Sequence, residues 1–161
     1  MTAMKVREAT IEDLPLILTF IQELAEFEKL SDACTANIEG LSKNLFPKNG
    51  NPYANVIIGM IDDIPIGMAL YFFNFSTFTG APGLYLEDLY IREQYRGHGA
   101  GKQFFTELKK IALAKECKRM EWVVLDWNEK ARKFYKNIYA KEQSDWIICR
   151  LDGEDLSRPI I

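Results

Sequence analysis

The spacing of the hydrophobic side chains divides the chain into helical and extended segments. Four stretches place leucine, isoleucine, alanine or phenylalanine every three or four positions, which is the spacing of an amphipathic helix. At the first of them Thr10 and Asp13 form a capping-box pattern, and Pro15 follows so closely that we expect an irregular first turn. The predicted helices cover residues 10–28, 34–46, 103–115 and 129–138.

Extended segments are predicted where apolar, aromatic and β-branched residues form short runs between turn residues. Asp62 and Asp63 separate two such runs and predict a hairpin turn, whereas residues 75–83 predict a longer loop. The predicted strands cover residues 6–9, 54–61, 64–74, 84–91, 120–126 and 146–151. The chain of 161 residues is long enough to bury a core, and we expect one domain over residues 1–161.

Composition narrows the classes of function. A net charge of −3 argues against a nucleic-acid surface and suits a cationic substrate better. Cys34, Cys117 and Cys149 are widely spaced, so we expect reduced thiols in a cytoplasm and neither a disulfide framework nor a zinc site. No apolar run is long enough to span a membrane, and residues 1–7 lack the apolar centre of a signal peptide.

The predicted strand at residues 84–91 leads into a glycine-rich turn and then a helix. Gly97, Gly99 and Gly101 have no Cβ, so the backbone can approach a ligand and turn its N–H groups inward. The helix adds unpaired amides and the positive end of its dipole, which favour a pyrophosphate. Arg96 and Lys102 flank the glycines and could pair with the same anion. The glycines alone leave open a simple glycine-rich helix start.

Two familiar phosphate-binding loops do not match this spacing. A Walker-type loop needs Ser or Thr after Gly-Lys, but Gln103 follows Lys102 here. The dinucleotide fingerprint needs G-x-G-x-x-G, whereas residues 97–101 read G-x-G-x-G. The pattern Gln94-x-x-Gly97-x-Gly99 does match the segment that wraps the coenzyme A pyrophosphate in the GNAT superfamily of acyl-CoA-dependent N-acetyltransferases, which the chain resembles.

The resemblance extends over residues 5–152 and is greatest to the diamine (spermidine/spermine) acetyltransferases and their thialysine acetyltransferase relatives. It implies an α/β (α+β) fold with a twisted, mostly antiparallel central sheet flanked by helices. Acetyl-CoA would enter where the central strand and its neighbour splay apart. Residues 76–80 replace the Asp-Pro-Trp of the polyamine enzymes, which argues against long polyamines as the best substrates. The segments that carry the resemblance are residues 25–29, 85–88, 95–97, 125–128 and 134–136.

Single residues acquire expected roles from this resemblance. Glu87 and Asp88 interrupt an apolar run, and in a regular strand consecutive side chains point to opposite faces. We predict that Glu87 takes the proton of the amine, directly or through water, and that Tyr135 protonates the leaving thiolate. Phe27, Glu28, Glu87 and Asp88 form the predicted substrate site. The residues alone leave open a strand-end charge for Glu87, a core position for Tyr135 and a solvated helix end for Glu28.

Contacts to acetyl-CoA are predicted along the same segments. Free backbone N–H groups near residues 89–91 can hold the thioester carbonyl and stabilise its developing negative charge. His98 is expected to contribute its amide and not its imidazole, and no metal is expected. The predicted contacts are Leu89, Tyr90, Ile91, Arg96, Gly97, His98, Gly99, Ala100, Gly101, Lys102, Asn128 and Lys136.

The predicted function is transfer of an acetyl group to the primary amine of a small substrate, a thialysine-like amino acid or a diamine, by direct attack without an acyl-enzyme. Two alternatives stay open. One is acetylation of a peptide or protein amine, and the other is a non-catalytic acyl-CoA sensor that would not need Tyr135 or Glu87. The resemblance also implies a homodimer, with residues 152–161 as a tail that could pack on a partner subunit; no nucleic-acid or membrane partner is expected.

Overall fold

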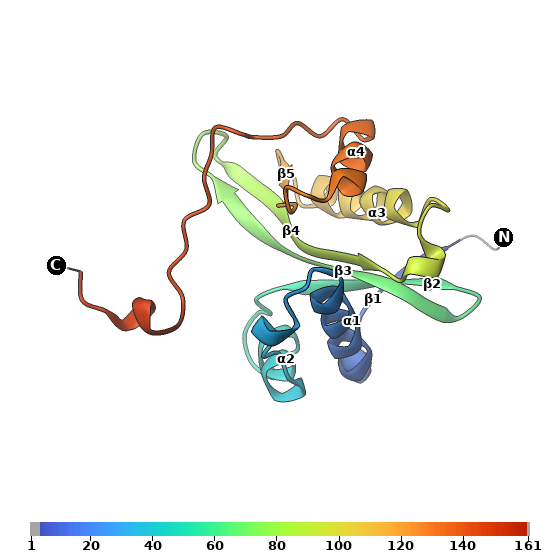
Figure 1. The fold of residues 1–161 in the computed structure, drawn as a ribbon, viewed down its shortest axis with the longest axis horizontal. Coiled ribbons are helices and arrows are strands. Elements are labelled where there is room, and N and C mark those ends of the chain that lie inside the picture. Colours follow the sequence, from blue (N-terminus) through green and yellow to red (C-terminus); the bar gives the residue numbers. More distant parts are fainter. Residues whose placement is uncertain (1–3, 161) are drawn as a thin grey trace. The chain divides into compact units, whose positions relative to one another are not determined.

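Five strands form one sheet in the order β1-β2-β3-β4-β5 in the computed structural model, which describes residues 4–160 (Figure 1). Neighbouring strands pair antiparallel, except that β4 and β5 are parallel, so the predicted mostly antiparallel sheet is confirmed. The chain consists of two compact units, residues 1–123 with the whole sheet and residues 124–161. The strands are β1 (Lys5–Glu8), β2 (Asn55–Ile61), β3 (Ile64–Ser76), β4 (Ala81–Ile91) and β5 (Met120–Glu121).

Helices cover both faces of the sheet in the first unit. Helices α1 (Leu14–Phe27) and α2 (Ile38–Leu45) lie on one face, and α3 (Ala100–Ala114) lies on the other (Figure 1). On the α1 face Ile17 and Phe20 pack in a core with residues of β2, β3 and β4. On the α3 face a Cβ at Gly59 would lie 2.7 Å from the ring of Phe104, so the missing side chain of this glycine lets α3 approach the sheet.

The start of α1 is irregular, as predicted. A 3-10 turn (Ile11–Asp13) precedes the helix, and Pro15 occupies a first-turn position whose N–H would lack a helical partner anyway. The carboxylate of Asp13 accepts hydrogen bonds from both terminal guanidinium nitrogens of Arg7 at 2.7 Å and from the N–H of Thr10 at 2.8 Å. The hydrogen bonds from Arg7, aided by the N–H of Thr10, lower the pKa of Asp13 from 3.8 to about 2.

We expect Asp13→Asn to lower the free energy of unfolding by about 1–2 kcal/mol at neutral pH, because the variant loses a charge-assisted pair. The native pKa of Asp13 lies below its unfolded value, so this contribution is complete above about pH 4 and disappears as the pH falls towards 2. Urea unfolding of both proteins between pH 2 and pH 7 measures the difference. A stability difference that stays the same at both ends of that range would contradict the explanation.

The connection between β3 and β4 is shorter than predicted. Both strands extend into the segment expected to be a loop at residues 75–83, and only the turn Thr77–Gly80 separates them. Phe75 still pairs with Pro82, and Ser76 with Ala81. The loop prediction was wrong because pairing with a neighbouring strand sustains extended backbone through residues of turn-like composition.

Two other predicted strands differ from the structure. The strand expected at residues 120–126 pairs with β4 only at Met120 and Glu121, and residues 146–151 form no strand. The side chains of Trp146, Ile147 and Ile148 are exposed. A run of apolar residues forms a strand only where another backbone satisfies its N–H and C=O groups, and no described strand pairs with this segment.

The second unit contains helix α4 (Glu129–Asn137) and a short 3-10 turn (Gly153–Ser157). The side-chain oxygen of Asn128 accepts the N–H of Ala131 at 3.2 Å, so Asn128 caps α4 as predicted. Residues 1–3 and 161 lie outside the described part, and these include the start of the segment inspected for a signal peptide and the last residue of the predicted tail. Among residues 4–160, none of the helices combines the length and hydrophobicity needed to cross a bilayer.

Candidate functional site

Strand β4 contains an extra residue where its two carboxylates lie. In the register with β3, Asp88 is opposite Leu70 and Leu86 is opposite Tyr71, so Glu87 has no partner. This arrangement is a β-bulge, in which one unpaired residue shifts the alternation of side chains. The regular alternation that the sequence suggested for Glu87 and Asp88 was therefore wrong, because the irregularity is defined by the pairing with β3.

The bulge turns Asp88 towards the face covered by α1. Tyr85 stacks on Phe72 with ring centroids 5.0 Å apart, and Tyr90 lies 5.9 Å from the ring of Phe20 in α1. Phe72 and Tyr90 both belong to the core on the α1 face. In an unbroken strand, residues 85 and 90 would point to opposite faces, so the extra residue must lie between them. Asp88, two positions before Tyr90, shares its face.

The environment of Asp88 disfavours its charge. Burial, together with the negative charges of Glu87 and Glu28, raises the pKa of Asp88 from 3.8 to about 6. Burial also raises the pKa of Glu28, the residue that follows α1. Over residues 4–160, none of the ion pairs includes any of these three carboxylates. Glu28, Glu87 and Asp88 thus form an acidic cluster that a cation would stabilise.

A contact between Arg92 and Glu23, which the sequence did not predict, fixes α1 to the end of β4. The guanidinium of Arg92 binds both carboxylate oxygens of Glu23 at 2.9–3.2 Å and lies 4.9 Å from the ring of Phe20. Hydrogen bonding to Arg92 lowers the pKa of Glu23. This pair holds the helix that ends at Phe27, directly before Glu28.

The glycine loop has the predicted arrangement of strand, loop and helix. Gly97 and Gly99 adopt φ values of 83° and 88°, and α3 begins at Ala100, three residues earlier than expected. Nothing lies within 4 Å of the position of a Cβ on either glycine, so the loop is open on that side. Positive φ and open space at the start of a 15-residue helix fit the pyrophosphate of coenzyme A.

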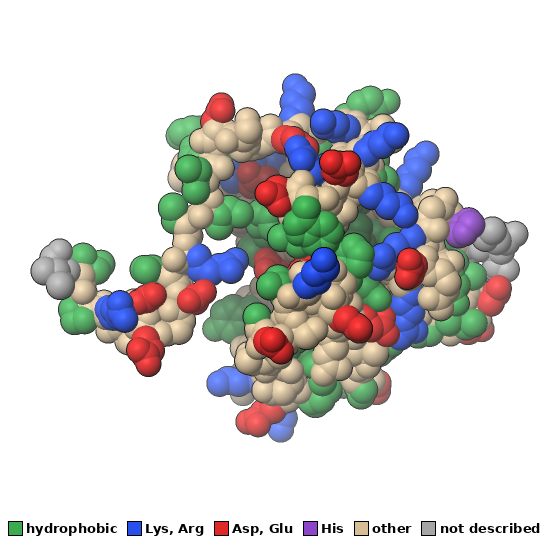
Figure 2. Space-filling model, viewed as in Figure 1, with side chains coloured by type: hydrophobic (Ala, Val, Ile, Leu, Met, Phe, Trp, Pro, Cys, Tyr) green, Lys and Arg blue, Asp and Glu red, His purple; other side chains and the backbone are tan. Residues whose placement is uncertain are grey.

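The side chains around the loop differ in exposure. Lys102 lies exposed in the first turn of α3 and is available to an anion, whereas Ala100 is buried and can offer only its backbone. His98, the single histidine of the chain, is exposed and drawn in purple in Figure 2. Among residues 4–160, no group of three or more His, Cys, Asp or Glu side chains could hold a metal ion.

Arg96 contacts protein groups rather than the open side of the loop. Its Nε donates a hydrogen bond to the carbonyl oxygen of Ile91 at 2.6 Å. The guanidinium carbon lies 4.6 Å from the ring centroid of Phe27 and 5.6 Å from that of Tyr90. A predicted cofactor residue and a predicted substrate residue are thus in contact, although 69 positions separate them in the sequence.

The outer edge of β4 offers backbone donors where the thioester carbonyl was expected. Strand β5 pairs with β4 only at residues 84–85, and no other described strand lies against that edge. The N–H of Arg92 donates to Ile66 of β3, so by alternation the N–H groups of Leu89 and Ile91 point away from β3. The N–H of Tyr90, between them, faces β3 instead. The prediction that Tyr90 also offers a free backbone donor to the thioester is therefore wrong.

Helix α4 carries the predicted residues of the second unit. Tyr135 is partly buried, and burial raises its pKa above the ordinary value of 10. Lys136 is exposed in the last turn, and the side-chain oxygen of Asn128 is used by the helix cap. The roles of these three residues beside β4 stay predictions.

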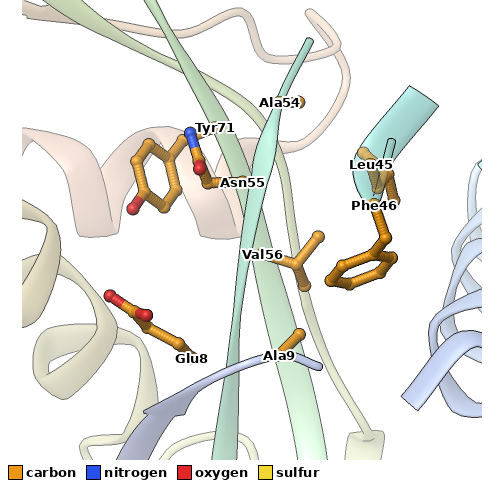
Figure 3. A pocket seen from close by; sticks show the side chains of 8 residues that line it. All are labelled: Glu8, Ala9, Leu45, Phe46, Ala54, Asn55, Val56 and Tyr71. Carbon is orange, nitrogen blue, oxygen red and sulfur yellow. The ribbon is translucent and has the colours of Figure 1, made fainter. Parts of the chain in front are cut away.

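A small pocket lies apart from these residues. Figure 3 shows the carboxylate of Glu8 and the hydroxyl of Tyr71 on one side of β2, with Leu45 and Phe46 on the other. Burial, and then the charge of Glu8, raise the pKa of Tyr71. The pocket holds about 100 Å³, well below the several hundred Å³ of a typical ligand site, and includes none of the predicted site residues.

Comparisons with known proteins agree on one family. The sequence profile of the acetyltransferase (GNAT) family matches residues 21–138. Thialysine N-epsilon-acetyltransferase of Sus scrofa is 36% identical, over 96% of this chain and 95% of that protein. L-ornithine N5-acetyltransferase of Arabidopsis thaliana is 29% identical, over 94% and 86%. An integron cassette protein from the mobile metagenome of V. cholerae superposes with a TM-score of 0.77 at 25% identity, covering 98% of this chain and 97% of that one.

Proposed function

Because this chain belongs to the GNAT family of N-acetyltransferases, for which acetyl-CoA is the donor, we propose that it acetylates the primary amine of a small cationic substrate, such as a thialysine-like amino acid or a diamine. The observation that carries the proposal is the unpaired acidic cluster of Glu28, Glu87 and Asp88 at the bulge of β4. The relatives support the same class, since their names specify thialysine and ornithine.

The donor is held by the loop and by the edge of β4. The amides of Gly97, His98, Gly99 and Gly101 and the ammonium of Lys102 bind its pyrophosphate. Acetyl-CoA supplies the activated acetyl group. The outward N–H groups of β4 bind the thioester oxygen and stabilise the negative charge that develops on it. At the start and in the last turn of α4, the side-chain N–H₂ of Asn128 and the ammonium of Lys136 complete the donor contacts.

The amine must lose a proton before it attacks, since an alkylamine with a pKa of about 10.4 is mostly protonated at neutral pH. Asp88 and Glu28 bind the ammonium form and orient it. Glu87, the exposed residue of the bulge, accepts the proton directly or through water. Tyr135 protonates the departing thiolate; its raised pKa keeps the hydroxyl protonated at neutral pH, as an acid requires.

The remaining expectations follow the family resemblance. We propose that residues 1–161 work as one catalytic domain, that the protein forms a homodimer and that it acts in the cytoplasm. No step of the proposed reaction uses a metal.

Thiol release from acetyl-CoA, measured with thialysine, ornithine, lysine, putrescine, spermidine and a lysine-containing peptide, tests the substrate class. We expect at least one small amine to have a kcat/KM at least tenfold above that of the peptide, because the acidic cluster recognises a compact cation. Preference for the peptide would replace the small-amine assignment with the peptide alternative. Binding of acetyl-CoA without turnover of any amine would favour the non-catalytic sensor.

A further inference from the structure

We propose that Arg96 is a positioning residue for the amine and not a ligand of the donor's pyrophosphate. This inference rests on the proposed function and deepens it. The contacts of Arg96 connect three parts of the first unit: the end of α1, the end of β4 and the start of the glycine loop.

Several contacts hold the guanidinium of Arg96 in place at once. Its Nε is bonded to the Ile91 carbonyl at 2.6 Å, and its cationic carbon lies within 6 Å of the rings of Phe27 and Tyr90. Each cation–π contact is an electrostatic attraction to the face of the ring, and it strengthens as water is excluded. These contacts fix the orientation of the guanidinium plane, so Arg96 can reach a phosphate only at the edge that carries its two terminal nitrogens. Lys102 and the helix amides can meet the anion without such a restriction.

The end of α1 lies against Arg96. Phe27 is the final residue of α1 and is 40% exposed, and the guanidinium of Arg96 lies over its ring at 4.6 Å from the centroid. Glu28 follows directly, and its charge contributes to the raised pKa of Asp88. The chain then turns away at Lys29, which has a φ of 60°. Arg96 therefore fixes the spacing between Glu28, just after α1, and Asp88 on β4, the two carboxylates proposed to bind the amine.

Two acetyl donors distinguish a role of Arg96 in positioning the amine from a role in binding the pyrophosphate. Acetyl-CoA contains the pyrophosphate, whereas S-acetylpantetheine offers the same thioester without it. We expect Arg96→Met to raise the amine KM about tenfold with both donors and to change the dissociation constant of acetyl-CoA, measured by calorimetry, less than about threefold. Lys102→Ala is the matched control, and it should show the converse: weaker acetyl-CoA binding, with unchanged kinetics on S-acetylpantetheine.

A second variant at position 96 tests the proposal independently of Arg96→Met. Arg96→Lys retains a cation for a phosphate but loses the Nε donor and the planar stack, so it should raise the amine KM nearly as much as Arg96→Met. Phe27→Leu should raise the same KM, and the double variant Phe27→Leu/Arg96→Met should be less than additive, because both changes remove one contact. Circular dichroism confirms that each variant is folded.

Three results would overturn the proposal: a tenfold loss of acetyl-CoA affinity in Arg96→Met, full activity of Arg96→Lys, or additive effects of the Phe27 and Arg96 changes. Failure of the proposed function is distinguishable from these. If wild type acetylates no amine, the dissociation constants of acetyl-CoA for wild type, Arg96→Met and Lys102→Ala still show which of the two cations holds the pyrophosphate.

Discussion

Replacing Tyr135 by phenylalanine is expected to lower kcat by a factor of about 100 or more, the range for the loss of a general acid. The change removes only the hydroxyl and leaves the ring and its packing in place. Without this proton donor the thiolate must leave unprotonated. Because burial raises the pKa of Tyr135 above its ordinary value, the wild-type hydroxyl keeps its proton at neutral pH, and loss of this acid should lower kcat only on the alkaline side.

Stopped assays of thiol release with the best amine, alongside calorimetry of acetyl-CoA binding, measure this effect. Tyr139→Phe is the matched control, since Tyr139 is 91% exposed just beyond α4 and has no proposed role. The control should keep wild-type kcat, and both variants should bind acetyl-CoA normally. A Tyr135→Phe enzyme within fivefold of wild type would remove the general-acid assignment.

Asp88→Asn is expected to lower kcat/KM for the amine roughly 30-fold to 1,000-fold near pH 8, the range for removing one partner of a desolvated charge pair. Asp88 is ionised above its pKa of about 6, so wild-type kcat/KM should fall as the pH drops through that value. The variant should lose this dependence. Asp63→Asn, in the exposed turn between β2 and β3, is the control and should retain the wild-type pH profile.

The same substitution is expected to stabilise the fold. Since the pKa of Asp88 is higher in the folded chain than the ordinary 3.8, the folded state binds the proton more tightly, and wild-type stability falls as the pH rises from about 4 to about 6. Asp88→Asn removes this loss and should raise the free energy of unfolding by about 1–3 kcal/mol at pH 8, with a higher Tm. An unchanged or lower Tm would show that the charge of Asp88 does not destabilise the folded state.

Features fixed by local chemistry were predictable from the sequence. The glycine loop could be predicted because Gly97 and Gly99 adopt positive φ, which favours glycine. The caps were predictable for a similar reason, since Asp13 and Asn128 bond to backbone within three residues of themselves. The spacing of apolar residues located the end of α1 to within one residue, at Phe27 instead of Glu28, whereas its start lies four residues later than the predicted residue 10.

Features fixed by distant pairing were not predictable. The bulge at Glu87 exists only in the register between β4 and β3, and no residue of β4 alone reveals it. The contacts of Arg96 with Phe27 and of Arg92 with Glu23 each join residues 69 positions apart. The strand expected at residues 146–151 had suitable composition, but composition does not supply a neighbouring backbone.

The bulge also constrains how the gene can change over evolutionary time. Deleting Glu87 would remove a residue without a partner, yet it would restore the two-residue repeat of β4 and rotate one part of the strand against the other. Either Asp88 and Tyr90 would leave the α1 face, or Tyr85 and the residues before it would. We therefore expect lineages of this enzyme to accept replacements within residues 85–90, apart from Glu87 and Asp88, more readily than a change in the number of these residues, unless β3 gains or loses a residue at the same level.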